Sequence, residues 1–213
     1  MSFVIFAGCQ YFGVMIGERR CLSFENKIQN ENVKKVRRIN KNVVTCAGGS
    51  ESIINVVWKP LLEHNYKEKL SYEDCVLLCK EKCDSIYDEY EGLYKQNDLS
   101  ANIGIMGLNK NGQISLNTIS FTNGEIKNLI TNYVETDDNG FVYFATGING
   151  NLQNIFYDKF MKCPRFTLEN LKSIFYQTVH QELKNDISIN DRFIMEFIER
   201  RDLIERDKIR IDK

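Results

Sequence analysis

The chain has 213 residues, of which 43% are hydrophobic and 27% are charged, a composition typical of a soluble globular protein. Its 28 basic and 29 acidic residues leave a net charge of −1, and no block of like charge stands apart, so we expect no nucleic-acid partner. The longest apolar stretch is interrupted by Gly8 and Gly13 and has no basic segment before it, so we expect neither a membrane span nor a signal peptide.

The numbers of prolines and cysteines indicate how many domains the chain has and in which compartment it resides. The two prolines and the absence of a low-complexity linker favour a single domain over residues 1–213. Seven cysteines, an odd number, are typical of reduced thiols when no secretory signal is present. The sequence therefore predicts one cytoplasmic domain.

The first half of the chain predicts two pairs of strands followed by two helices. Segments rich in β-branched and aromatic residues, separated by turn residues, predict strands at Ser2–Ala7, Tyr11–Glu18, Val36–Ile39 and Val43–Cys46. Ser50 stands where a helix N-cap belongs, and apolar residues then recur at helical spacing to about Tyr66, although Pro60 should kink or end the helix. Ser71 and Asp74 resemble a capping box at the start of a second helix, which extends to about Leu93.

The second half repeats this order. Alternating and helical patterns predict a hairpin of Asn102–Leu108 and Gln113–Phe121, a strand at Phe141–Thr146, a helix at Asn151–Met161, a helix capped by Thr167 and reaching Lys184, and a strand at Phe193–Ile198. The charged segment Glu199–Lys213 fits either a strand or a solvated tail. Strands, two helices, strands, two helices and a strand predict an α+β fold, a four-layer αββα sandwich of two facing antiparallel sheets flanked by helix pairs.

One stretch resembles a known family. Residues Asn32–Ile39 are NVKKVRRI and residues Val43–Ser50 are VVTCAGGS. This combination of a basic K-K-V-R-R strand with an A-G-G turn into a helix resembles the proteasome β-subunit family, especially its bacterial HslV-type branch. That family begins with a small hydroxyl residue freed by removal of the initiator Met, and Ser2 stands at that place. The resemblance implies an N-terminal-nucleophile (Ntn) hydrolase fold.

The resemblance also implies a catalytic set. Ser2 is the nucleophile, Glu18 and Lys35 support it, and Gly48 donates a backbone N–H to the oxyanion. The chemistry is sound, because a free α-amine with a pKa near ~8 can take the proton of its own hydroxyl, directly or through water. A lysine ammonium favours the developing alkoxide, and glycine lets a carbonyl approach the main chain.

Other roles follow from the same resemblance. Cys21, Val33 and Cys46 would line a substrate pocket, and Ser188 and Asp191 would support the site from the loop before the last strand. No cofactor and no metal is expected. We assign no catalytic or metal-binding role to the isolated His64 and His180.

Three features depart from the family pattern. The family usually has Asp where Glu18 stands, and the extra methylene shifts the carboxylate. Where the family has Gly-Ser-Gly, whose Ser bonds the terminal amine, this chain has Ile148, which cannot make that bond. A retained Met1 would cap the amine and forbid the mechanism.

Simpler interpretations stand beside these. Strand alternation places Lys34 and Lys35 on opposite faces, so only one can point inward, and only the resemblance prefers Lys35. Cys75, Cys79 and Cys83 lie along one helical face and could suggest a metal site, but their spacing and apolar neighbours favour core packing.

The resulting prediction is a proteasome/HslV-like peptidase that hydrolyses peptide bonds with Ser2 after Met1 is removed. The resemblance implies a ring-like homo-oligomer, a peptide or unfolded-protein substrate, and an ATPase unfoldase as a partner. Two alternatives stay open: a catalytically silent Ntn-fold structural or binding subunit, and a small-molecule amidase on the same fold.

Overall fold

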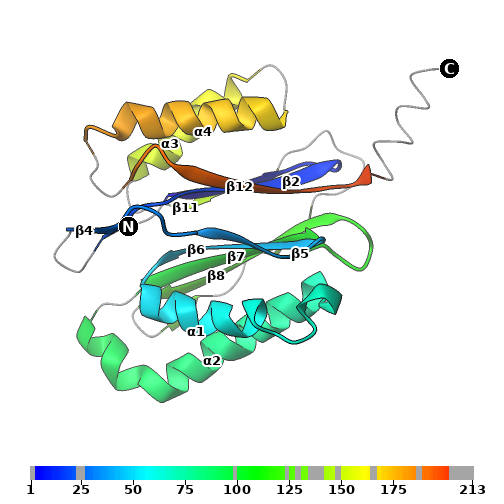
Figure 1. The fold of residues 1–213 in the computed structure, drawn as a ribbon, viewed down its shortest axis with the longest axis vertical. Coiled ribbons are helices and arrows are strands. Elements are labelled where there is room, and N and C mark those ends of the chain that lie inside the picture. The colour runs from blue at the N-terminus through cyan, green and yellow to red at the C-terminus, as the bar shows by residue number, and fades with distance from the viewer. Residues whose placement is uncertain are drawn as a thin grey trace.

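The computed structural model describes residues 3–22, 27–97, 100–122, 125–127, 131–133, 142–146, 150–163, 167–185 and 189–201. These residues form four layers (Figure 1). Two β-sheets face each other, helices α3 and α4 cover the outer face of one sheet, and helices α1 and α2 cover the outer face of the other. The predicted α+β sandwich is therefore confirmed.

The first sheet has the order β11-β1-β2-β12, and each neighbouring pair is antiparallel. Its strands are β1 (Val4–Gly8), β2 (Phe12–Glu18), β11 (Val142–Thr146) and β12 (Phe193–Glu199). The helices on this sheet are α3 (Gly150–Met161) and α4 (Leu168–Glu182). Thr167 caps α4, because its side chain accepts a hydrogen bond from the backbone N–H of Asn170.

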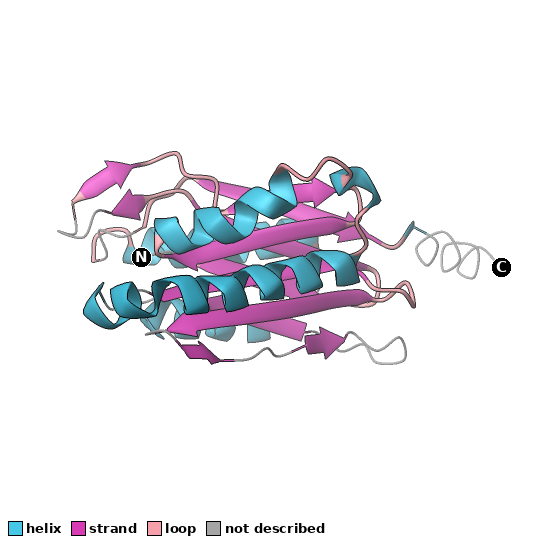
Figure 2. Ribbon diagram, turned by 90° about the horizontal axis from the view of Figure 1, so that it is seen from below, coloured by secondary structure: helices cyan, strands magenta, loops and turns pink. Residues whose placement is uncertain are grey.

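The second sheet has the order β10-β8-β7-β6-β5, with β9 also paired to β8. Its strands are β5 (Val36–Asn40), β6 (Val43–Gly49), β7 (Ser100–Leu108), β8 (Ile114–Thr122), β9 (Glu125–Lys127) and β10 (Thr131–Tyr133). Helices α1 (Glu51–Leu62) and α2 (Tyr72–Asn97) lie side by side on it (Figure 2), with a 3₁₀ turn η1 (Lys67–Lys69) between them. The short strands β3 (Cys21–Leu22) and β4 (Ile28–Asn30) form a separate ribbon.

The helix starts follow the expected signals with one exception. Ser71 and Asp74 bond each other's backbone N–H, which is the reciprocal capping expected before α2. Ser50 occupies the N-cap position of α1 but makes no side-chain capping bond there. Pro60 lies inside α1, and the helix ends two residues later, short of the predicted end near Tyr66.

Side chains of the strands alternate between two kinds of core. Phe3 and Ile5 pack toward α3 and α4, whereas Val4 and Phe6 pack between the sheets. The thiols of α2 belong to a third core, between that helix, α1 and the second sheet, and comprise Cys75, Cys79 and Cys83. Within the described residues, no group of three or more potential His, Cys, Asp or Glu ligands gathers, and no helix has the length and apolarity to cross a bilayer.

Candidate active site

A buried ion pair joins the two sheets at one end of the sandwich. Glu18 is the last residue of β2, and Lys35 directly precedes β5. Lys35 Nζ donates to Glu18 Oε1, and the two residues are 5% and 0% exposed, respectively. Lys34 is exposed, so the tertiary structure selects Lys35 as the inward-pointing lysine.

Two backbone N–H groups complete the surroundings of the Glu18 carboxylate. Phe3 N–H donates to Oε1 over 3.3 Å, and Arg20 N–H donates to Oε2 over 2.6 Å. Phe3 is itself fixed, because its carbonyl accepts from Glu18 N–H at 3.1 Å and its ring stacks on Phe175 with centroids 5.2 Å apart. The residue that follows Ser2 is therefore held against the same carboxylate oxygen as the Lys35 ammonium.

Burial and pairing act in opposite directions on this site. Burial raises the pKa of Glu18, while Lys35 and the two backbone donors lower it. Burial likewise lowers the pKa of Lys35, and Glu18 opposes that shift. Each group thus depends on the other to stay charged in an environment with little water.

The last two residues of β6, Gly48 and Gly49, point their backbone N–H groups in opposite directions. Ala47 N–H donates to Lys35 O at 2.9 Å, which fixes the side of β6 that faces β5. Since N–H groups alternate along a strand, the N–H of Gly49 points to the same side, beyond the start of β5. Gly48 points its N–H toward β7, where its register partner is Asn102. Of the two glycines, it is therefore Gly49, and not the predicted Gly48, whose N–H lies on the Lys35 side of β6.

Gly49 also has a φ of 115°, a conformation that other residues rarely adopt. It lies at the junction of β6 and α1, beside a cleft. The cleft is lined by Cys21, Leu22, Val33, Lys34, Lys35, Arg37, Ala47, Gly49, Glu51, Ile54, Asn55 and Trp58. Two of the three predicted pocket residues are among them.

Cys46, the third predicted pocket residue, lies elsewhere. Its side chain is buried between the two sheets, in the core cluster that includes Met15 and Leu116. The reason is strand alternation, because Ala47 lines the cleft and its neighbour Cys46 must face the other way.

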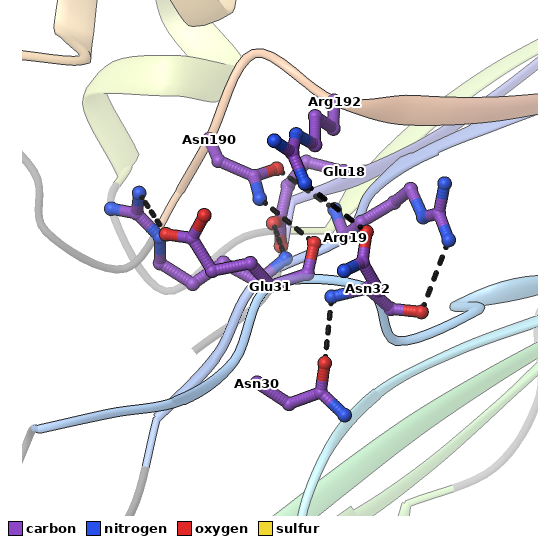
Figure 3. Close-up of polar contacts among 8 residues, drawn as sticks. Glu18, Arg19, Asn30, Glu31, Asn32, Asn190 and Arg192 are labelled. Carbon is purple, nitrogen blue, oxygen red and sulfur yellow. Dashed lines mark hydrogen bonds and ion pairs between the residues drawn. The ribbon is translucent and has the colours of Figure 1, made fainter.

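A network of polar contacts lies beside the ion pair and joins three distant segments (Figure 3). Asn190, which is 3% exposed, accepts from Arg19 N–H at 3.2 Å and donates to Glu31 O at 3.2 Å. Arg20 pairs with Glu31 over 2.8 Å. The network fixes the backbone on the C-terminal side of Glu18 to the segment before Lys35 and to the loop before β12.

Of the two supporting residues predicted from this loop, the structure describes Asp191. Its side chain is exposed, and the buried side chain here is that of its neighbour Asn190. Ser2, Ser188 and Ile148 lie outside the described residues.

The sequence matches no family model and no curated protein. Among solved structures, the fold is similar to HslV from Trypanosoma brucei, with a TM-score of 0.54 and 15% identity over 93% of this chain and 99% of that one. The chain has the proteasome-like Ntn fold. The similarity to HslV confirms, for the fold, the resemblance carried by the K-K-V-R-R and A-G-G segments.

Two Anbu structures have the same fold. The Anbu complex of Pseudomonas aeruginosa, solved as a helical assembly, has a TM-score of 0.69 and 14% identity, over 92% of this chain and 81% of that one. The Gly-1 mutant of Anbu from Hyphomicrobium sp. strain MC1 has a TM-score of 0.67 and 15% identity, over 93% and 82%. At these low sequence identities, the similarity shows the fold of the chain alone.

Several residues of the site were absent from the sequence prediction. Arg20 and Phe3 act through backbone N–H groups, which carry no side-chain signal. Asn190 contacts Arg19 across 171 residues. The helical spacing of Glu51, Ile54, Asn55 and Trp58 could have indicated that they share one face of α1.

Proposed function

We propose that the chain is an Ntn peptidase in which Ser2, after removal of Met1, attacks peptide bonds. The observation that carries this proposal is the position of Phe3, the residue to which Ser2 is bonded. Phe3 N–H and Lys35 Nζ donate to the same oxygen of the buried Glu18 carboxylate. A nucleophile attached to Phe3 would therefore act beside a lysine ammonium and a cleft.

The proposed reaction is acyl transfer. The Ser2 hydroxyl oxygen attacks the substrate carbonyl carbon, and the hydroxyl proton passes to the free α-amine, directly or through water. Lys35 stabilises the developing negative charge on the hydroxyl oxygen, and Gly49 N–H donates to the tetrahedral oxyanion. The carbon–nitrogen bond then breaks as the leaving amine takes up the proton, and water hydrolyses the Ser2 ester.

We also propose that the chain assembles with copies of itself. Support comes from the fold that it has in common with the Anbu complex, which forms a helical assembly. An ATPase unfoldase that delivers unfolded chains is the further partner proposed from the HslV resemblance. Light scattering coupled to size exclusion would measure the assembly mass, and a monomer at micromolar concentration would contradict self-assembly.

Intact mass tests the nucleophile directly. The untagged protein should lack Met1 and gain one adduct from a serine-reactive peptide inhibitor, and it should hydrolyse a fluorogenic peptide. Ser2→Ala should lose both adduct and hydrolysis, while Ser2→Thr should keep both, because threonine retains the hydroxyl. Both replacements are small, so removal of Met1 stays comparable and can be verified in the same spectrum.

The same experiment separates the alternatives. Hydrolysis by Ser2→Ala at the parent rate would exclude Ser2 as the nucleophile. Retained Met1 without an adduct would favour the catalytically silent subunit. An adduct on Ser2 with cleavage of small amides but of no peptide would favour the small-molecule amidase.

A further inference from the structure

The cleft beside the ion pair has a strongly charged wall. Lys34, which precedes β5, and Arg37, within β5, line it together with Lys35, whose charge is matched by Glu18. Glu51 is the single carboxylate among the lining residues. Apart from the Glu18–Lys35 pair, two cations therefore stand against one anion at the surface of the cleft.

Arg37 is held in a fixed orientation. Its guanidinium lies 4.8 Å from the centroid of the Trp58 ring, and its Nε donates to Lys34 O at 3.3 Å. Trp58 is 3% exposed, and its Nε1–H donates to Thr45 Oγ1 at 3.1 Å, so the ring is itself anchored in the core. The guanidinium thus loses little conformational freedom when it binds a ligand.

The fixed guanidinium has spare donor capacity. In the part of the chain that the structure describes, Arg37 forms no ion pair, and its one side-chain hydrogen bond is the one from Nε to Lys34 O. A planar guanidinium that is half-buried in a cleft and stacked on an aromatic ring is suited to bidentate binding of a carboxylate. Glu51 would weaken such binding through repulsion.

We propose that this cleft receives an acidic side chain of the substrate and that Arg37 is the residue that binds its carboxylate. The proposal rests on the peptidase function and specifies its substrate class. Val33, Ala47 and Ile54 give the cleft an apolar part that fits the methylene groups of such a side chain. Glutamate, with two methylenes, fits this combination better than aspartate.

Trp58 supplies the measurement, because it is the one tryptophan of the chain. Its fluorescence would be titrated with acetylated tetrapeptide amides that differ only in the last residue, which is Glu, Gln, Leu or Lys. The titration uses the Ser2→Ala protein, so that binding is observed without turnover. The Glu peptide should bind about tenfold more tightly than its uncharged isostere, the Gln peptide, as expected for a charge-assisted bidentate contact.

Two variants bracket the effect. Arg37→Met should bring the Glu-to-Gln affinity ratio to about one, because it keeps an extended side chain on Trp58 but removes the donors. Glu51→Gln, at the opposite-charge position of the same cleft, should raise the ratio about two- to threefold by removing repulsion. Thermal unfolding of both variants, with a midpoint close to that of the parent, would verify that the fold is kept.

The outcomes are unambiguous. Equal binding of the Glu and Gln peptides, tighter binding of the Leu or Lys peptide, absence of binding, or a ratio that survives Arg37→Met would each overturn the proposal. Hydrolysis by the Ser2 protein is measured separately. Cleavage after Leu and Glu at equal rates would support the peptidase function and contradict this specificity. Glu-selective binding without Ser2-dependent cleavage would support the carboxylate-binding cleft and contradict the peptidase function.

Discussion

Two ion pairs connect the same two sheets, and they differ in almost every respect. Glu18 and Lys35 are buried at the candidate active site. Arg38 of β5 and Glu196 of β12 lie 2.9 Å apart at the sheet edges, with side chains 35% and 29% exposed. Water can solvate either member of the second pair if its partner is lost, but it reaches the first pair poorly. Apolar residues of both sheets also pack together between them. The buried pair carries a desolvation cost that the proposed chemistry explains.

The largest expected effect is the loss of Lys35. Lys35→Met should lower the free energy of unfolding at neutral pH by about 3–5 kcal/mol, because it leaves the Glu18 carboxylate buried without its partner. Urea unfolding followed by circular dichroism would measure it. The double variant Glu18→Gln and Lys35→Met should recover most of the loss, and a double variant as unstable as the single one would show that the charge is not the cause.

The pH dependence sharpens this prediction. Burial already raises the pKa of Glu18 above its ordinary value of 4.5, and removal of Lys35 takes away the largest opposing influence. A raised pKa in the folded state contributes stability below the unfolded value that is lost as the pH rises through the folded value. Lys35→Met should therefore be destabilised much less at pH 4 than at pH 8 relative to the parent. An equal loss at both pH values would contradict an unpaired Glu18 carboxylate.

An intermediate effect is expected from the network beside the buried pair. Asn190→Ala removes the acceptor of Arg19 N–H and the donor to Glu31 O, and should cost about 1–3 kcal/mol because buried polar groups lose their partners. Asp191→Ala is the matched control, since that neighbouring side chain is exposed. Comparable losses in the two variants would show that the amide contacts are not specific.

The smallest effect should come from the exposed pair. Glu196→Gln removes the charge opposite Arg38. The hydrogen bond from the Arg38 guanidinium to Phe197 O, at 2.6 Å, remains. We expect a change of about 0–1 kcal/mol in the free energy of unfolding, which falls further at high salt. A loss as large as that of Lys35→Met would remove the distinction between the two pairs.

Local signals in the sequence predicted most elements of the fold. The Ser71–Asp74 capping box and the Thr167 cap depend on neighbours within three residues, so they could be read before the structure. The ribbon of β3 and β4 was missed, because strands of two and three residues are too short for an alternating pattern.

The candidate site was less accessible to the same reasoning. Alternation separated Lys34 from Lys35 but did not say which face was inside, and the resemblance supplied the choice. Gly48 and Gly49 point their N–H groups in opposite directions, and which of them faces the site depends on the pairing of β6 with β5. Long-range contacts of this kind are set by the tertiary structure and leave no local pattern.

The free thiols are distributed among the layers of the sandwich. Cys75, Cys79 and Cys83 lie on the buried face of α2, Cys46 lies between the sheets, and Cys163 follows α3. Burial raises the pKa of Cys46 and of Cys75 to about 12, so these thiols react slowly until their layer separates. Pulsed alkylation read by peptide mass would therefore record the order in which the layers around the buried thiols Cys46 and Cys75 open.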